Sequence, residues 1–327
     1  DNEPMTNLKI CILGGTGFVG RSLASRLVAL GHEVRIITRR RERQKRGLLV
    51  LPTLYLVQGD VHNPAVLRQH LQGMDVVINL VGILNERGYR GKEFERVHLE
   101  LPRKIVNACQ EVRVGRLLHM SALGASMEAP SHYLRTKARG EEVVHSAEKN
   151  DFNVTSFRPS VIFGPHDSFI NRFAWLMRLS PVYFPLACAG TRFQPVYVED
   201  VVTAFTHSLE DHHTFGQRYD LCGPEVYTLH ELVSYVADRT GLRRRIIDLN
   251  DTMSKMQAAC LQFIPGKPFS LDNYRSLQID SVCEKGFPPI FGIQPASLTS
   301  IVPTYLVKRP ARSEKYSGYR HLGRRDQ

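Results

Sequence analysis

The chain has 327 residues, 43% of them hydrophobic and 23% charged, a balance that predicts a globular protein with a large buried core and excludes a disordered chain. Much of its formal net charge of +11 comes from the run 39–46 and from the tail after Lys308. Because no helix-turn-helix, RNA-recognition or zinc-finger pattern accompanies this charge, we expect no nucleic-acid partner.

The six cysteines form no recognisable metal-binding pattern. There is no Cys-x-x-Cys pair and no His–Cys cluster at the spacing of zinc ligands, so we expect no metal site and buried thiols in a reducing compartment. No apolar run approaches the roughly 18 residues that a membrane span needs, and the N-terminal residues lack a secretory signal pattern. These features predict a cytoplasmic or matrix-like location. The cysteines are Cys11, Cys109, Cys188, Cys222, Cys260 and Cys283.

The predicted elements alternate between strands and helices from the start of the chain. The first strand, 8–13 (LKICIL), ends in glycines and leads into apolar residues at helical spacing over 18–30. Further strands are predicted at 33–38, 54–58 and 76–81, with a helical stretch between the last two.

The alternation continues with predicted helices over 93–112 and 131–149 and predicted strands over 116–120 and 154–157. Strands that alternate with helices imply a parallel sheet wound by right-handed crossovers. The chain up to about residue 160 therefore predicts an α/β fold, a doubly wound sheet of at least six strands.

The strongest functional signal is a glycine-rich turn between the first predicted strand and helix. It consists of Gly14, Gly15, Thr16, Gly17, Phe18, Val19 and Gly20. Gly14 and Gly17 let the backbone turn tightly and approach a pyrophosphate, Gly20 lets the helix pack on the strand, and the helix N-terminus offers N–H groups to phosphates. An ordinary strand–helix turn is the alternative interpretation, but such a turn does not require three glycines at this spacing. We predict a Rossmann-type dinucleotide site to which Gly14, Thr16, Gly17, Phe18, Val19 and Gly20 contribute.

The end of the second predicted strand indicates which dinucleotide is bound. NAD sites usually place an acidic residue there to bind the ribose 2′-hydroxyl, whereas this strand is followed by Arg39, Arg40 and Arg41. Guanidinium groups form charge-assisted, often bidentate hydrogen bonds with a 2′-phosphate. Arg39, with Arg40 or Arg41 helping, therefore predicts NADP(H) in preference to NAD(H). A solvated basic loop is the alternative interpretation.

Two further strand ends are predicted to contact the cofactor. Asp60 and Val61 follow the third strand, where a loop can hydrogen-bond an adenine edge. Leu80, Val81 and Gly82 follow the fourth strand, and ligands of α/β sheets bind outside the carboxyl ends of strands. Gly82 lets the backbone approach the cofactor closely.

Tyr133 and Lys137 lie four residues apart on a predicted helix and therefore on one face of it. A neighbouring cation favours phenolate, as a general acid/base acting on an alcohol or ketone requires. The pattern alone is common on exposed helices, but here it follows Ser121 in a Rossmann-type chain. We therefore predict a catalytic set of Tyr133, Lys137 and Ser121, in which Tyr133 and Lys137 also bind the cofactor.

After Gly164 the regular alternation breaks down. Prolines, aromatic residues and loops dominate up to Gln194, and a strand–helix unit returns over 195–209. We predict a smaller lobe inserted around returning Rossmann elements, followed by a loose tail. The predicted division is a Rossmann domain of residues 5–165 and 195–222, a substrate or partner lobe of residues 166–194 and 223–308, and a basic tail of residues 309–327.

Together these motifs resemble the extended or atypical short-chain dehydrogenase/reductase superfamily, the epimerase/dehydratase-like group, over nearly the whole chain. Residues 158–165 (RPSVIFGP) and 194–201 (QPVYVEDV) are similar to its signature turns around the nicotinamide and the substrate. This resemblance implies that Pro159 is a further cofactor contact.

More narrowly, residues 97–102 (VHLELP), 119–125 (HMSALGA) and 301–306 (IVPTYL) are similar to bacterial relatives of the nucleotide-binding accessory subunit of respiratory complex I. This resemblance implies NADPH binding and an accessory or assembly role with little or no turnover. It also implies a cytoplasmic protein, peripheral at the inner face of the respiratory membrane, that contacts complex I or the membrane surface.

Two departures from active relatives bear on turnover. Ser121 is followed by Ala122, where such relatives usually carry a second hydroxyl residue, and His98 stands where they often carry Asn, as a core or ribose-side group. Tyr133 and Lys137 are therefore cofactor-positioning residues first and catalytic residues second. The alternative function is an active NADPH-dependent oxidoreductase or epimerase with a quinone-like or lipid-like substrate. A sensor of the NADPH/NADP⁺ ratio is less favoured, because nothing marks a partner domain.

The smaller lobe carries large apolar residues whose role the sequence leaves open. Five recur at near-helical spacing and three cluster upstream, and they can line an apolar pocket or lie on a membrane surface, although core packing is favoured. The basic side chains of the tail can likewise contact anionic lipid, although a solvated tail is the default interpretation. The apolar residues are Met253, Met256, Cys260, Phe263 and Ile264, and upstream Trp175, Met177 and Phe184.

Overall fold

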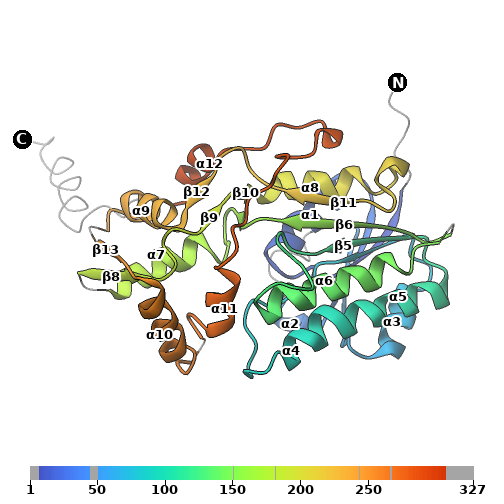
Figure 1. Cartoon of the computed structure of the whole chain (residues 1–327). Coiled ribbons are helices and arrows are strands. Elements are labelled where there is room, and N and C mark those ends of the chain that lie inside the picture. Colours follow the sequence, from blue (N-terminus) through green and yellow to red (C-terminus); the bar gives the residue numbers. More distant parts are fainter. Residues whose placement is uncertain are drawn as a thin grey trace, which may run out of the picture.

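A computed structural model of the protein describes residues 7–44, 51–149, 151–180, 182–242, 244–265 and 267–306. Within these residues the central feature is a seven-stranded sheet in the order β11-β6-β5-β4-β1-β2-β3 (Figure 1). Its neighbouring strands pair in parallel, which confirms the predicted doubly wound α/β sheet. The strands are β1 (Lys9–Leu13), β2 (Glu33–Thr38), β3 (Leu54–Gln58), β4 (Val76–Asn79), β5 (Arg116–Met120), β6 (Asn153–Pro159) and β11 (Arg218–Leu221).

Helices cover both faces of this sheet because its strands are apolar on both sides. Ile10 and Ile12 of β1 belong to one buried cluster, whereas Cys11 and Leu13 belong to another, as alternation along a strand requires. The first cluster is covered by α1 (Phe18–Ala29) and α8 (Val198–His207). The second is covered by α3 (Pro64–Leu71), α5 (Leu101–Val112) and α6 (His132–His145).

Two predicted elements differ in detail. The predicted helix over 93–112 consists of α4 (Lys92–Glu95), a π-helical turn η1 (Arg96–Glu100) and α5. β4 ends at Asn79 and not at Val81, because the Asn79 side-chain oxygen accepts the Val81 N–H at 3.2 Å and turns the chain out of the sheet. A short helix, α2 (Arg41–Gln44), follows β2.

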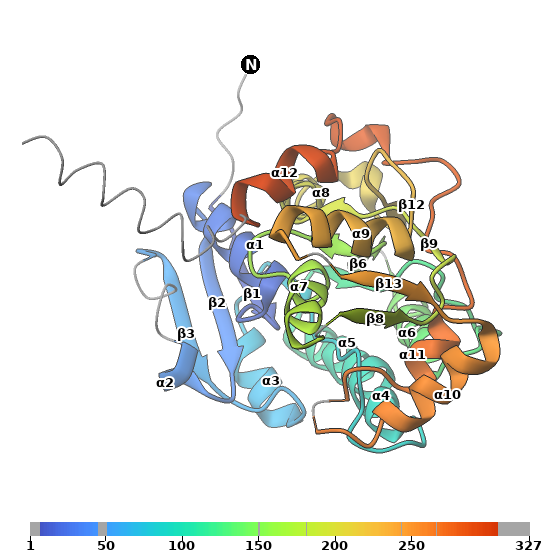
Figure 2. The ribbon, with the colours of Figure 1, turned by 90° about the vertical axis from the view of Figure 1, so that its left-hand side faces the viewer.

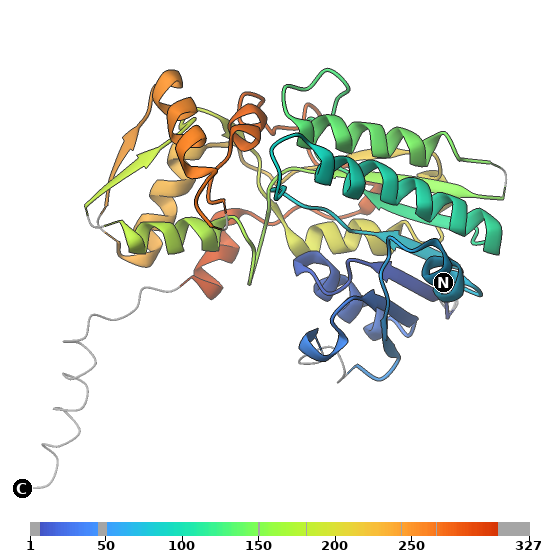
Figure 3. The same cartoon turned by 90° about the horizontal axis from the view of Figure 1, so that it is seen from below.

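The smaller lobe lies beside the carboxyl ends of the sheet strands (Figures 1 and 3). Its core joins residues from both sides of α8 in the chain, including Phe163, Met177, Phe193 and Val233. Its helices are α7 (Ile170–Leu179), α9 (Leu229–Thr240), α10 (Asp251–Leu261), α11 (Leu271–Ser276) and α12 (Leu298–Tyr305). Two short turns, η2 (His212–Thr214) and η3 (Pro289–Phe291), pack instead against the half that carries the sheet, where Thr214 accepts from Arg116 at 2.9 Å and Phe291 joins the cluster under α1 and α8.

Three short strand pairs lie outside the seven-stranded sheet in the part of the chain that the structure describes. They are β7 (Ile162–Phe163) with β10 (Val196–Tyr197), β9 (Arg192–Phe193) with β12 (Tyr227–Thr228), and β8 (Tyr183–Leu186) with β13 (Arg245–Asp248). The exact domain boundaries given above stay a prediction. The basic tail and part of the basic run after β2 lie outside the described residues.

The cysteines differ from the expectation of buried thiols. Cys222 and Cys283 form a disulfide, although 61 positions separate them, and Cys260 is exposed. The two segments meet because the Gln194 side chain accepts the Cys283 N–H at 3.0 Å and donates to the Gly223 carbonyl at 2.7 Å. Such a pairing depends on tertiary structure, so the prediction of thiols at these two positions is wrong.

Among the described helices, none is both long and apolar enough to cross a membrane. No group of three or more His, Cys, Asp or Glu residues placed to hold a metal ion occurs within the described ranges.

Candidate functional site

The glycine turn packs tightly between the end of β4 and the start of α1. Gly14 has a φ of +83°, and a Cβ atom there would lie 3.0 Å from the carbonyl carbon of Leu80. A Cβ atom at Gly20 would lie 2.5 Å from the Gly14 carbonyl oxygen, so a side chain is excluded at this position too. Gly17 is the N-cap of α1, and no acidic side chain lies in the first turn. The N–H groups of this turn can therefore donate hydrogen bonds to an anionic ligand, and the turn fits a pyrophosphate.

Gly15 has a function that the sequence did not reveal. A Cβ atom at Gly15 would lie 2.8 Å from the side chain of Ile36 on β2. The absence of a side chain at Gly15 therefore lets the turn pack directly against β2. This packing requirement is separate from phosphate binding. The signal for it was the doubled glycine at the start of the motif.

The predicted adenine-side residues lie at the carboxyl ends of β2 and β3. Arg39 and Arg40 follow β2 and are exposed. Asp60 follows β3, and its carboxylate accepts the His62 N–H at 3.1 Å within the turn that leads to α3. Val61 packs against the buried cluster under α3 and α5. The structure thus places these residues along one edge of the sheet, next to the strand that carries the glycine turn.

The turn after β4 reaches the Tyr133 helix. A Cβ atom at Gly82 would lie 3.3 Å from Lys137 Nζ and 3.7 Å from His98 Nε2. Leu80 donates its N–H to the Leu13 carbonyl at 2.9 Å, which holds this turn beside the glycine turn. The two predicted halves of the site therefore meet at Gly82.

Tyr133 and Lys137 lie in the first turns of α6. Ser131 caps this helix by accepting the Leu134 N–H at 3.2 Å. Lys137 Nζ donates to the Met120 carbonyl at 3.1 Å, and burial lowers the pKa of Lys137 to about 8. Burial raises the pKa of Tyr133 to about 12. The expectation that Lys137 favours the phenolate is therefore not met in this structure, because burial opposes ionisation of the phenol.

Ser121 lies at the end of β5 with its side chain buried. Its N–H donates to the Phe157 carbonyl at 2.7 Å, but its hydroxyl has no hydrogen-bond partner among the described residues. A buried hydroxyl without a partner costs about 1–3 kcal/mol, which a ligand atom would recover. Ala122 packs with Ala129 and Leu134 beside Tyr133, so the wall next to Ser121 is apolar.

Both ring nitrogens of His98 have hydrogen-bond partners within the protein. Its Nε2 accepts the Ile83 N–H at 3.1 Å, so its Nδ1 carries the proton and donates to Thr136 Oγ1 at 3.1 Å. Burial lowers the pKa of His98 to about 2, which keeps the ring neutral. A Cβ atom at Gly140 would lie 1.8 Å from the His98 carbonyl oxygen, so the π-helical turn and α6 touch through backbone. His98 thereby fixes both the Gly82 turn and the helix of Tyr133.

Sequence reasoning missed a row of polar residues under α6. Asn79, His119 and Ser156 are register partners across β4, β5 and β6, and all three are buried. Asn79 Nδ2 lies 3.1 Å from His119 Nδ1, and Ser156 Oγ lies 2.9 Å from Nε2 of His145. The available signal was a set of polar side chains at the inward positions of strands that otherwise face a core.

Asp272 of the smaller lobe also contacts the site. Its carboxylate accepts the N–H groups of His132 at 2.7 Å and Tyr133 at 3.1 Å, and so completes the N-terminus of α6. Nearby, Asn273 donates to the Leu84 carbonyl at 3.2 Å. More than 130 positions separate Asp272 from α6, so no local sequence signal could have found this contact.

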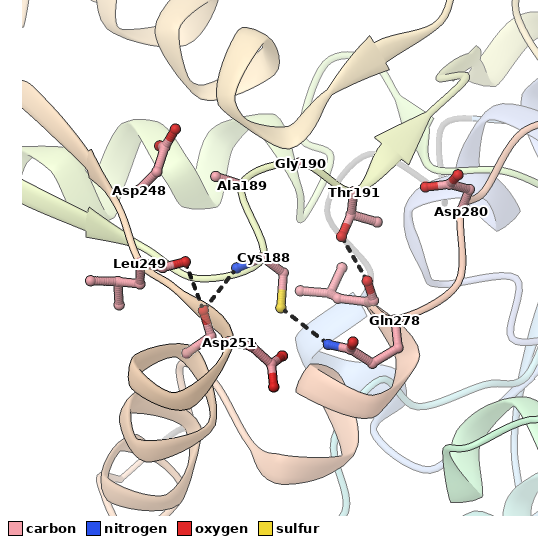
Figure 4. A pocket seen from close by; sticks show the side chains of 11 residues that line it. Cys188, Ala189, Gly190, Thr191, Asp248, Leu249, Asp251, Gln278 and Asp280 are labelled. Atoms are coloured by element: carbon pink, nitrogen blue, oxygen red, sulfur yellow. Dashed lines mark hydrogen bonds between the residues drawn. The ribbon is translucent and has the colours of Figure 1, made fainter.

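A cavity of about 430 Å³ lies within the smaller lobe, away from all the predicted site residues (Figure 4). It is lined by the segment after β8, the start of α10 and the segment after α11. Cys188 donates its N–H to Ser254 Oγ at 3.2 Å, and Asp248, Asp251 and Asp280 contribute carboxylates. The cavity is therefore polar and not an apolar pocket.

The large apolar residues of the smaller lobe divide into two groups. Met177 and Phe184 are buried, so core packing is confirmed for them. The others are exposed, and for them the core prediction is wrong: α10 buries Ser254 and Ala258 and turns its apolar stripe outward. We call this stripe the α10 face, and it consists of Met253, Met256, Cys260, Phe263 and Ile264.

The strand order, the glycine turn at the crossover between β1 and β4, and the lobe beside the strand ends define a Rossmann-type dinucleotide-binding protein. The chain belongs to the NAD dependent epimerase/dehydratase family, whose model matches residues 10–222. This confirms the resemblance inferred from the motifs.

Named relatives match different shares of the chain. The chain is 33% identical to subunit 9 of the NADH dehydrogenase (ubiquinone) 1 alpha subcomplex of Arabidopsis thaliana, covering 83% of this chain and 68% of that one. It is 30% identical to the NADH-ubiquinone oxidoreductase 40 kDa subunit of Neurospora crassa, covering 90% and 78%. It is 31% identical to a ceramide reductase of Caulobacter vibrioides, covering 58% and 57%.

Solved structures share the fold. A DesIV double mutant, a dTDP-glucose 4,6-dehydratase of Streptomyces venezuelae with NAD bound, superposes with a TM-score of 0.70 at 17% identity, covering 91% of this chain and 96% of that chain. At this identity the likeness establishes the architecture of both lobes.

Proposed function

We propose that the protein binds NADP(H) and serves as an accessory or assembly-type subunit of respiratory complex I, with little or no turnover. The observation that carries the proposal is the share of this chain that aligns with a complex I subunit. The Neurospora subunit of NADH-ubiquinone oxidoreductase aligns with 90% of this chain, and so with the smaller lobe as well as the nucleotide-binding half. A shared fold alone can extend as far, as the dehydratase structure shows, but it does so at 17% identity and not at the 30% found for the Neurospora subunit.

The geometry supports a dinucleotide that spans the strand ends. The pyrophosphate would bind the turn from Gly14 to Gly20, with Thr16, Phe18 and Val19 along it, and the 2′-phosphate would bind Arg39 and Arg40. Asp60 and Val61 would border the adenine. Leu80, Val81, Gly82, Tyr133, Lys137 and Pro159 would surround the nicotinamide end.

Three features of the reactive end favour a structural cofactor. Lys137 donates to the Met120 carbonyl, the pKa of Tyr133 is raised to about 12, and Ala122 stands beside Ser121 in place of a second hydroxyl. A cofactor that binds only the folded protein stabilises it by mass action without being turned over. In this role it would hold the two lobes in the form that the partner binds.

A second candidate, an NADPH-dependent reductase, is favoured by the unpartnered Ser121 hydroxyl and by the likeness to a ceramide reductase. The cofactor would supply hydride to a carbonyl carbon. Ser121 would donate a hydrogen bond to the carbonyl oxygen, Tyr133 would transfer its proton to that oxygen, and Lys137 would hold the tyrosine and the ribose. The apolar wall at Ala122 suits a lipid-like or quinone-like substrate.

The location follows from the same proposal. We place the protein in the cytoplasm, or in a matrix-like space, peripheral at the inner face of the respiratory membrane. The α10 face supplies a surface for the complex, because an exposed apolar stripe on a helix typically marks an interaction site.

The test is co-fractionation of the tagged full chain with detergent-solubilised complex I from its native cell, with NADPH assayed in the same fractions. We expect stoichiometric co-migration with the cofactor retained. A protein that migrates alone and reduces quinone or lipid carbonyls, with Tyr133→Phe inactive, would establish the reductase and reject the accessory role.

A further inference from the structure

One side of the smaller lobe exposes large apolar side chains beside two arginines. This outer face consists of Trp175, Arg178 and Leu179 of α7, Tyr183 of β8, and Arg245 and Ile247 of β13. Trp175 is 54% exposed, Leu179 63% and Tyr183 55%. Figure 2 shows α7, β8 and β13 together on the side that faces the viewer.

The outer face is one continuous surface. Trp175, Arg178 and Leu179 are spaced i, i+3 and i+4, so they share one side of α7. Tyr183 follows α7 closely in the chain and is the register partner of Arg245. Ile247 lies two residues beyond Arg245 and therefore on the same side of β13.

The core of the lobe does not explain these exposed residues. α7 packs inward through Ile170, Ala174 and Met177, and β8 packs inward through Phe184 and Leu186. The exposed residues are those on the opposite sides of the same elements. Burial within the fold therefore gives no reason for a tryptophan, a leucine and a tyrosine at these positions, whereas a binding surface does.

The positive charge on and near the outer face indicates the kind of partner that this face binds. Arg178 and Arg245 are exposed beside the apolar side chains. Leu306, the last described residue, packs in the core cluster of this same lobe, so the residues that follow it in the sequence start from the smaller lobe. The 21 residues that follow include seven Lys and Arg and two acidic residues. An occupant must therefore be anionic and must also accept apolar side chains.

We propose that the outer face binds the surface of an anionic lipid bilayer. Trp175, Leu179 and Tyr183 enter the boundary between headgroups and acyl chains, where aromatic residues are favoured, and Arg178 and Arg245 contact lipid phosphates. The inference deepens the peripheral location proposed above, but it requires neither the cofactor nor the complex. The α10 face remains available for a protein partner.

The sequence provides a direct probe, because Trp175 is the only tryptophan of the chain. The full-length protein is mixed with phosphatidylcholine vesicles with or without phosphatidylglycerol, and co-sedimentation and tryptophan emission are measured. With the anionic vesicles we expect co-sedimentation, a blue shift of the emission, and quenching by lipids brominated on the acyl chains. Pure phosphatidylcholine should bind at least tenfold more weakly.

Matched variants locate the contact. Leu179→Glu with Tyr183→Ser, and separately Arg178→Gln with Arg245→Gln, are each expected to weaken binding to anionic vesicles about tenfold. Tyr55→Ser serves as control, because Tyr55 is 52% exposed on β3 in the other half of the molecule. NADPH affinity, measured in parallel, should be unchanged in all of them.

Three outcomes would overturn the proposal. The first is the absence of binding to anionic vesicles. The second is co-sedimentation that leaves Trp175 emission unchanged and that is lost when the Lys and Arg residues of the tail are changed to Gln. This result would show that the tail alone binds the vesicles. The third is a blue shift with solubilised complex I but not with vesicles, which would identify a protein surface. None of these affects NADPH binding or co-migration, so they are distinguishable from failure of the proposed function.

Discussion

Two helices of the protein, α6 and α10, break the usual pattern of a surface helix in opposite directions. α6 buries charged side chains, Lys137 at 5% and Glu141 at 2% exposure, whereas α10 buries Ser254 and Ala258 and exposes Met256 at 60%. Sequences depart from the binary pattern mainly where function requires it. On α6 the fold itself satisfies the buried charges, because Glu141 pairs with Arg158 and Arg218 and Lys137 donates to the Met120 carbonyl, whereas α10 leaves its apolar side exposed.

The largest expected effect tests how tightly α6 is fitted. Gly140→Ala would place Cβ 1.8 Å from the His98 carbonyl oxygen, a clash that no side-chain rotation can relieve because the oxygen belongs to the backbone. We expect a loss of about 3 kcal/mol in the free energy of urea unfolding, even though alanine ordinarily gains about 1 kcal/mol over glycine in a helix. Gly190→Ala is the control, because a Cβ atom there meets nothing within 4 Å. Equal stability of the two variants would show that the contact between α6 and the π-helical turn is loose.

The second effect concerns the cation buried by α6. Burial lowers the pKa of Lys137 from its ordinary 10.5 to about 8, so between these values the unfolded chain binds a proton that the folded protein does not. The stability of the cofactor-free protein should therefore rise with pH across this window, by about 3 kcal/mol from this group. Lys137→Met should remove the rise, as urea unfolding at pH 7, 8.5 and 10 would show. A variant with the same pH dependence as the wild type would contradict a buried cation.

The third effect concerns the other end of the site. Arg39→Ala with Arg40→Ala should weaken NADPH binding about tenfold to a hundredfold and leave NADH binding unchanged, because only NADPH carries the 2′-phosphate. Fluorescence titration of both cofactors measures this. Arg26→Ala with Arg103→Ala changes the net charge equally at exposed positions of α1 and α5 and should have no effect. Equal affinities of the wild type for the two cofactors would reject the preference for NADP(H).

The smallest effect on stability is expected on α10. Met256→Glu with Phe263→Glu should change the free energy of unfolding by no more than about 0.5 kcal/mol, since both side chains are exposed, yet it should abolish co-migration with complex I. Met127→Glu, at a position 51% exposed outside the lobe core, should leave co-migration intact. Unaltered co-migration of the double variant would remove the assigned role of the α10 face.

The parts of the molecule that the sequence predicted are those with local signals. The sheet and the glycine turn follow from alternating periods and from three spaced glycines, and the structure places Gly82 beside Lys137. The internal role of His98, the contact from Asp272 and the Cys222–Cys283 disulfide depend on segments brought together from far apart in the chain. The spacing of apolar residues in α10 predicts that the helix has an apolar side. It does not tell whether that side faces the core or the solvent, because this depends on which segments pack against the helix.

The position of β11 in the chain affects how the protein is made. This strand pairs with β6, yet it is synthesised only after α7, β8 and α8. During translation β6 therefore keeps an open edge until residue 221 has left the ribosome, and unpaired strand edges are where nascent chains aggregate. A fragment that stops near residue 165 contains the whole glycine turn and all of the Tyr133 helix, but it would lack the strand that closes the sheet. The nucleotide-binding half is contiguous in space, but its last strand is synthesised only after part of the smaller lobe has been synthesised.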